Sequence, residues 1–164
     1  MKWALVFFIT VVFKGSADLQ AVRQLYQNAE HNEKNCKQLL SLLSKSQNRD
    51  PVFEGYEACA TMMMANHVFN PIAKLKYFKR GKEMLEKAIN RDPENCELRF
   101  LRFGVQTNIP SFLGYKSEIE KDKKFLIKHT FYLEDQYLKK WITSFLLDSS
   151  YVKSEEKVLI QNKI

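Results

Sequence analysis

The chain has 164 residues, of which 45% are hydrophobic and 27% charged, and it carries only 5 glycines and 4 prolines. This length suits one domain, and the balance of apolar and charged residues excludes a wholly disordered chain. The scarcity of turn-forming residues excludes an all-β fold, which needs many tight turns. The formal net charge of +7 favours an acidic partner or anionic lipid headgroups through long-range attraction.

The N-terminal residues have the features of an export signal. A positive charge at Lys2 precedes an apolar run at residues 3–13, and residues 15–17 are small, as a signal peptidase requires. The run is shorter than the roughly 20 residues of a membrane span. We therefore expect residues 1–17 to be a cleaved signal peptide and residues 18–164 to be one helical domain, periplasmic or extracellular. An uncleaved membrane anchor at residues 3–13 is the alternative.

Helical periodicity runs through the rest of the chain. It is clearest after Pro71, where one stripe of a helical wheel collects Tyr77, Phe78, Gly81, Met84, Leu85, Ala88 and Ile89. Predicted helices lie at residues 18–31, 33–47, 52–68, 72–90, 94–107, 117–130, 134–147 and 154–162. Short links between successive helices imply antiparallel neighbours. The predicted fold class is therefore all-α, built from stacked antiparallel helix hairpins.

The tetrapeptide Asn-Arg-Asp-Pro occurs twice, at residues 48–51 and 90–93. Each copy lies between two stretches with helical periodicity. Proline restricts the residue before it and fits the first turn of a helix, so each copy is predicted to end one helix and begin the next. Two further helix starts are predicted from capping signals, at Ser117, which has Glu120 three residues later, and at Ser154.

A series of small, large, small and proline positions is formed by Gly81, Leu85, Ala88 and Pro93, and it is followed by Phe100, Phe103 and Gly104. With these positions, residues 81–104 resemble the end of one tetratricopeptide repeat and the start of the next. The resemblance implies a short right-handed solenoid whose concave face binds a peptide or a partner helix. The two Asp-Pro copies are 42 residues apart (48 to 90), whereas the repeat of that family is about 34 residues long. We therefore predict no regular array of such repeats.

The segment 108–115 is the first candidate for a binding surface. Loops between helices are usually polar, yet this one contains Pro110, Phe112, Leu113 and Tyr115. One interpretation is an exposed apolar lip that anchors a partner. The other is that Phe112 and Leu113 fold back onto the core while Gly114 supplies an unusual backbone angle. Residues 98–115 also resemble a segment of small exported bacterial proteins, which implies an extracytoplasmic location but no activity.

Two arginines provide the second candidate. Arg99 and Arg102 are spaced i, i+3 on one helix face, where their guanidinium groups suit a carboxylate or phosphate of a partner. The alternative is ion pairing with acidic groups of a neighbouring helix. The three cysteines, Cys36, Cys59 and Cys96, stand beside other apolar residues and are predicted to be small buried residues.

No catalytic, metal-binding or phosphate-binding motif stands out in the sequence. The histidines are scattered, and consecutive methionines at 62–64 point about 100° apart on a helix, so no metal or cofactor is predicted. Aromatic residues and charges in segment 74–82 lie on opposite helix faces, which argues against nucleic-acid binding.

These patterns predict a non-enzymatic interaction or scaffold module of the bacterial envelope or exterior, with a protein or peptide partner. A membrane-surface protein held by the anchor at 3–13 is the first alternative. A small hydrolase whose site assembles from several helices is the second. The sequence does not indicate the oligomeric state.

Overall fold

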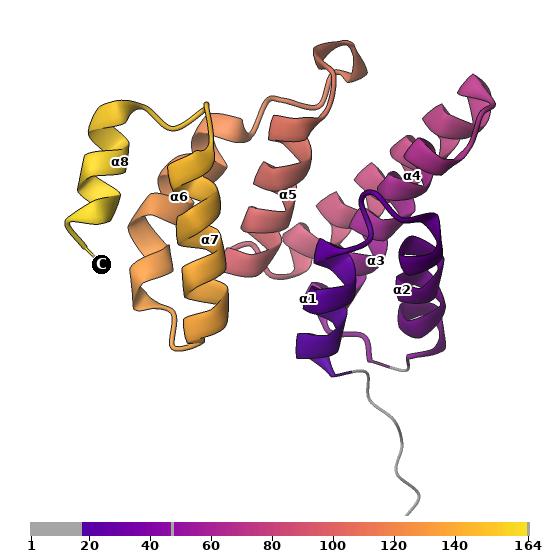
Figure 1. Cartoon of the computed structure of the whole chain (residues 1–164), viewed down its shortest axis with the longest axis horizontal. Helices are drawn as coiled ribbons and strands as arrows, with labels where there is room; N and C mark the ends of the chain where they lie inside the picture. Colours follow the sequence, from indigo (N-terminus) through magenta and orange to yellow (C-terminus); the bar gives the residue numbers. More distant parts are fainter. Residues whose placement is uncertain (1–17, 47, 164) are drawn as a thin grey trace, which may run out of the picture.

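A computed structural model describes residues 18–46 and 48–163. In these residues the chain forms eight α-helices, three short 3₁₀ turns and no strand (Figure 1). The predicted all-α class is confirmed. The predicted signal segment 1–17, including the alternative anchor at 3–13, lies outside the described residues. No helix of the described residues is both long and apolar enough to cross a membrane.

All eight predicted helices are present. They are α1 (Leu19–Gln27), α2 (Glu33–Lys45), α3 (Pro51–Met63), α4 (Pro71–Arg91), α5 (Cys96–Asn108), α6 (Ile119–His129), α7 (Gln136–Asp148) and α8 (Ser154–Gln161). The 3₁₀ turns are η1 (Met64–His67), η2 (Ser111–Leu113) and η3 (Thr130–Tyr132). The helix predicted at 52–68 is too long because η1 continues α3 with a tighter turn, which apolar periodicity does not distinguish from an α-helix. The helix predicted at 18–31 already ends at Gln27, and the others agree within two residues at each end.

Aspartate and asparagine side chains begin most of the helices by accepting a hydrogen bond from a backbone N–H of the first turn. These N-caps are Asp18, Asn32, Asp50, Asn70, Asn95 and Asp135. The two predicted serine caps are wrong. Ser117 lies in a turn before α6, which starts after Glu118 without a side-chain cap. Ser154 is the first residue of α8, where Glu156 accepts from the Lys153 N–H at 2.8 Å.

The two Asn-Arg-Asp-Pro copies adopt different structures. In the first copy, Asp50 caps α3 and Pro51 is its first residue, as predicted, but the preceding helix α2 has already ended at Lys45. In the second copy, α4 ends at Arg91 and Pro93 lies in a turn before α5. Each copy therefore performs only one of the two predicted roles. The first begins a helix and the second ends one, because the link between the two helices at each junction is longer than predicted.

Arg91 of the second copy contacts the first copy directly. Its guanidinium donates to the backbone carbonyl of Arg49 at 2.9 Å and pairs with Glu54 at 2.5 Å. The end of α4 is thereby held against the start of α3, at one end of the longest helix pair (Figure 1).

Helix α5 is the central element because its sides are buried in two different apolar clusters. Leu98 and Leu101 belong to a cluster formed with α1 to α4, whereas Phe100 and Phe103 belong to a cluster formed with α6, α7 and α8. The predicted stripe of α4 is largely confirmed, since its buried residues are Phe78, Gly81, Leu85, Ala88 and Ile89. Burial of these surfaces is the main force that holds the helices together.

The three cysteines are buried free thiols, which confirms the prediction of small buried residues. Burial raises the pKa of Cys36 to about 11, of Cys59 to about 12 and of Cys96 to about 11. Only the thiolate reacts as a nucleophile. We expect no reaction with Ellman's reagent at pH 8 in the native protein and reaction of all three thiols in guanidinium chloride. Rapid labelling of the native protein would show that the helices open readily.

Candidate partner-binding groove

A groove of about 760 Å³ lies between α1, α3, α4, α5 and α7. In Figure 1 the N-terminal half of α4 and the η2 loop stand on its two sides. Its lining is mainly apolar, and its polar side chains are Gln27, Glu30, Asn66, Lys74 and Asn108. The volume falls within the roughly 300 to 1,000 Å³ of typical ligand sites, so the groove is large enough for several side chains of a partner.

An aromatic wall closes the groove on the side of α7. The rings of Phe100 and Trp141 meet edge to face with centroids 4.9 Å apart, and Phe100 and Phe145 do so at 5.3 Å. Tyr26 of α1 meets Trp141 in the same way at 6.1 Å. Such edge-to-face contacts favour one arrangement of the rings. The wall is therefore a preformed surface.

Part of the loop 108–115 is an exposed lip, and part of it packs onto the core, so each of the two interpretations holds for some of its residues. Phe112 is 85% exposed at the edge of the groove, which agrees with an apolar lip, and Pro110 is exposed beside it. Leu113 is only partly exposed because it folds back onto the core. Gly114 has φ of 63°, the left-handed conformation that glycine adopts most readily.

Tyr115 belongs to a different site from Phe112. Its side chain is buried, its hydroxyl donates to Glu86, and its ring meets Phe78 edge to face at 6.2 Å. Burial and the neighbouring Glu86 carboxylate raise the pKa of Tyr115 well above its usual value. Tyr115 lines a polar pocket of about 400 Å³ together with Arg99 and Arg102.

Arg99 and Arg102 are buried and carry ion pairs within the protein. Both Arg102 Nε and Nη2 donate to the Asp122 carboxylate, at 2.7 and 2.8 Å, and Arg99 Nη1 donates to it at 2.8 Å. Arg102 also donates to Glu86 at 2.8 Å. Burial alone would lower the pKa of Arg102, but the hydrogen bond and charge of Asp122 raise it. The two arginines therefore form ion pairs with acidic groups of the neighbouring helices α4 and α6, as the second interpretation of the sequence predicted.

The six predicted binding residues thus do not form one site. Pro110, Phe112 and Leu113 line the apolar groove, whereas Arg99, Arg102 and Tyr115 line the polar pocket. The other residues of the groove, such as Leu75, Val105 and Trp141, were not singled out by the sequence, because apolar residues at helical spacing look the same in a groove and in a core.

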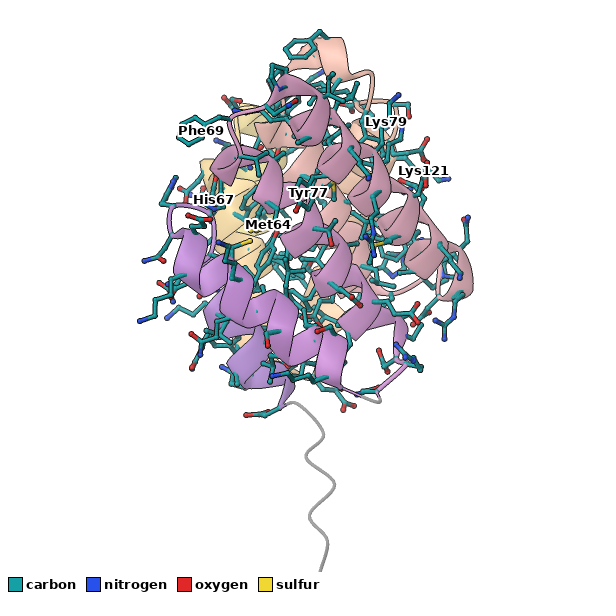
Figure 2. All side chains as sticks on the ribbon, turned by 90° about the vertical axis from the view of Figure 1, so that its right-hand side faces the viewer. Met64, His67, Phe69, Tyr77, Lys79 and Lys121 are labelled. Carbon is teal, nitrogen blue, oxygen red and sulfur yellow. The ribbon has the colours of Figure 1, made fainter. Side chains whose placement is uncertain are left out.

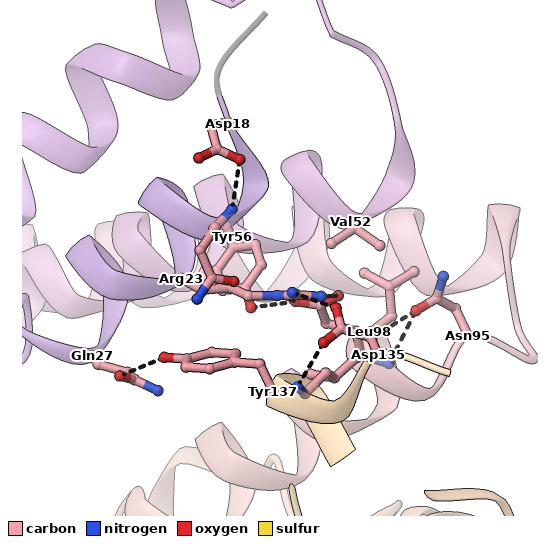
Figure 3. Close-up of polar contacts among 12 residues, drawn as sticks. Asp18, Arg23, Gln27, Val52, Tyr56, Asn95, Leu98, Asp135 and Tyr137 are labelled. Carbon is pink, nitrogen blue, oxygen red and sulfur yellow. Dashed lines mark hydrogen bonds and ion pairs between the residues drawn. The ribbon is translucent and has the colours of Figure 1, made fainter. Parts of the chain in front are cut away.

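A second buried ion-pair network joins four parts of the chain (Figure 3). Arg23 of α1 donates to Glu97 of α5 at 2.6 and 2.7 Å and to Asp135 before α7 at 2.7 Å. The hydroxyl of Tyr56 in α3 also donates to Glu97. Hydrogen bonds from the Leu138 N–H and from Arg23 lower the pKa of Asp135. This network fixes α1, α3 and α7 around α5, and so positions the walls of the groove.

In the part of the chain that the structure describes, no group of three His, Cys, Asp or Glu side chains is placed to hold a metal ion. The groove lining contains one carboxylate, Glu30, and no histidine. Comparison with known protein families, with curated proteins and with solved structures gave no match.

Proposed function

We propose that this protein is a non-enzymatic interaction module of the bacterial envelope or exterior, and that it holds an amphipathic helix of a partner protein in the apolar groove. One observation carries the proposal. Leu75, 43% exposed on α4, and Phe112, 85% exposed at the lip, present apolar surface to water in a groove whose lining is mainly apolar. Exposed apolar surface of this extent is typical of binding sites.

A helix suits the groove better than an extended peptide does. An extended peptide gains affinity by pairing its backbone with a sheet edge, but these walls are helices, whose backbone groups are already paired. A bound helix satisfies its own backbone hydrogen bonds and presents apolar side chains at i, i+3, i+4 and i+7. Lys74 on the groove wall favours an acidic residue on the polar side of that helix.

The finer architecture is part of the same proposal. Stacked antiparallel hairpins would form a short right-handed superhelix of the tetratricopeptide-like kind, with the groove on its concave face. Gly81, at a position where that family has a small residue, supports this arrangement, since a Cβ atom there would lie 2.5 Å from the carbonyl oxygen of Ala58. Export through residues 1–17 remains part of the proposal.

Introducing a charged side chain into the apolar groove provides the test. We expect Leu75→Glu to weaken the binding of an amphipathic helical peptide, selected from a peptide library, by about tenfold or more, because burying a carboxylate against apolar walls is costly. Phe112→Ala is expected to weaken binding while leaving the circular-dichroism spectrum and thermal unfolding unchanged. Fluorescence anisotropy measures the affinities.

Leu159→Glu is the matched control, because Leu159 is 57% exposed on α8, outside the groove. It is expected to leave peptide affinity unchanged. Equal affinity of the Leu75→Glu and Leu159→Glu variants would place the binding surface elsewhere, and loss of folding in Phe112→Ala would show that this ring belongs to the core. The groove itself offers the hydrolase alternative one carboxylate and no histidine.

A further inference from the structure

Two protruding segments at one end of the molecule carry the most exposed large apolar side chains of that end. Phe69 and Ile72, at the turn into α4, are 100% and 80% exposed, and Phe112 of η2 is 85% exposed. Figures 1 and 2 both show the turn into α4 and the η2 loop at the upper end of the molecule. We call these three residues the apolar tip. They project outward, so a concave pocket of a protein partner would have to fit each of them separately.

The two chain segments that carry the apolar tip are basic and contain no acidic residue. Neither residues 58–82 nor residues 98–117 include an Asp or Glu. Lys74, Lys76 and Lys79 in the first turns of α4 are exposed, and no ion pair among the described residues involves them. Three other described lysines, Lys37, Lys121 and Lys123, do pair with nearby glutamates.

Protruding aromatic and aliphatic side chains ringed by lysines suit one kind of surface, the interface of an anionic bilayer. Apolar side chains enter the boundary between headgroups and acyl chains, and each lysine near the surface gains attraction from anionic lipids. A bilayer adapts to protruding residues and needs no matching shape. The charge of the chain, +7, adds long-range attraction of the same sign.

We infer that the apolar tip docks on lipid bilayers that contain anionic headgroups, with Phe69, Ile72 and Phe112 inserted and Lys74, Lys76 and Lys79 against the headgroups. This surface shares Phe112 and Lys74 with the groove that the proposed function uses, whereas its other residues lie outside the groove lining, and it does not involve the apolar run at residues 3–13. Phe112 of the tip lines the groove, as do Pro71 and Lys74 beside the other two tip residues, so the occupant of the groove lies close to the bilayer when the protein is docked.

A position-specific fluorophore tests where the protein touches the bilayer. The full chain carries Phe69→Cys, labelled with an environment-sensitive dye, while the native cysteines are buried. We expect its emission to shift to the blue with vesicles of equal parts phosphatidylglycerol and phosphatidylcholine, but not with phosphatidylcholine alone. The control label is at Tyr132→Cys, an exposed aromatic position (81%) in the η3 turn, which lies at the opposite end. A shift at Tyr132 without one at Phe69 overturns the inference.

Charge-neutral variants test the role of the lysines by vesicle co-sedimentation. Lys74→Gln/Lys76→Gln/Lys79→Gln is expected to weaken binding to the anionic vesicles roughly a hundredfold, since each lysine contributes roughly fivefold. The matched control, Lys124→Gln/Lys128→Gln/Lys140→Gln, removes the same charge from exposed sites on α6 and α7. An equal loss in both variants overturns the inference in favour of net charge alone, and no loss in either overturns it in favour of binding through another segment. Leu75→Gln, which alters the groove wall without adding a charge, is expected to weaken peptide binding but to leave vesicle binding within about threefold of wild type, so the two hypotheses fail separately.

Discussion

Replacing Asp122 with asparagine is expected to lower the free energy of unfolding by about 3–5 kcal/mol, because the substitution leaves buried guanidinium groups without their anion. The Asp122 side chain has no exposed surface and accepts hydrogen bonds from both Arg99 and Arg102. Asparagine has nearly the same shape, but its amide group adds donors where only acceptors are useful. Arg102 keeps Glu86 and, at 3.7 Å, Glu118 as acidic partners, whereas Arg99 loses its carboxylate partner. Urea unfolding followed by circular dichroism measures the change.

An exposed ion pair is the control for this prediction. Glu33 pairs with Lys37 at 2.7 Å on the surface of α2, with both side chains at least half exposed. Water and salt screen such a pair, so Glu33→Gln is expected to leave the unfolding midpoint unchanged within error. If Asp122→Asn were as mild as Glu33→Gln, the Asp122 cluster would have to be open to water, which its burial contradicts.

The helices could be predicted because each depends on signals that lie close together in the sequence. The apolar stripe of α4 repeats every three or four residues, and Asp50 with Pro51 marks the start of α3 directly. The errors arose where local signals were ambiguous. Ser117 has the chemistry of an N-cap, but the chain turns once more before α6 begins.

The candidate sites could be predicted only in part, because their residues meet across long stretches of chain. Arg99 pairs with a carboxylate 23 residues away, and Arg23 with one 74 residues away. Many acidic residues were available at comparable distances, and no pattern marks the right one. The lip residue Phe112 was identifiable because an aromatic side chain in a loop is unusual, whereas Leu75 and Val105 in the groove follow the same periodicity as the core.

The packing of α3 against α4 depends on Gly81, and alanine there is expected to destabilise the protein by about 2 kcal/mol. A Cβ atom would lie 2.5 Å from both the Ala58 carbonyl oxygen and Met62 Cγ, and 3.0 Å from the Met62 backbone nitrogen. Backbone atoms cannot rotate away as a side chain does, so the two helices must separate. Overpacking of this kind costs up to about 3 kcal/mol, offset by about 1 kcal/mol from the higher helix propensity of alanine.

Gly104→Ala is the matched substitution, and its expected effect has the opposite sign. The nearest atom to a Cβ at Gly104 is Phe145 Cζ at 3.9 Å, an ordinary contact. The gain in helix propensity therefore remains, and the variant should be more stable than wild type by about 0.5–1 kcal/mol. Thermal and urea unfolding of the two variants measure the difference. If both alanine substitutions stabilised the protein, helix propensity alone would determine their effects. The close contact between α3 and α4 at Gly81 would then be absent.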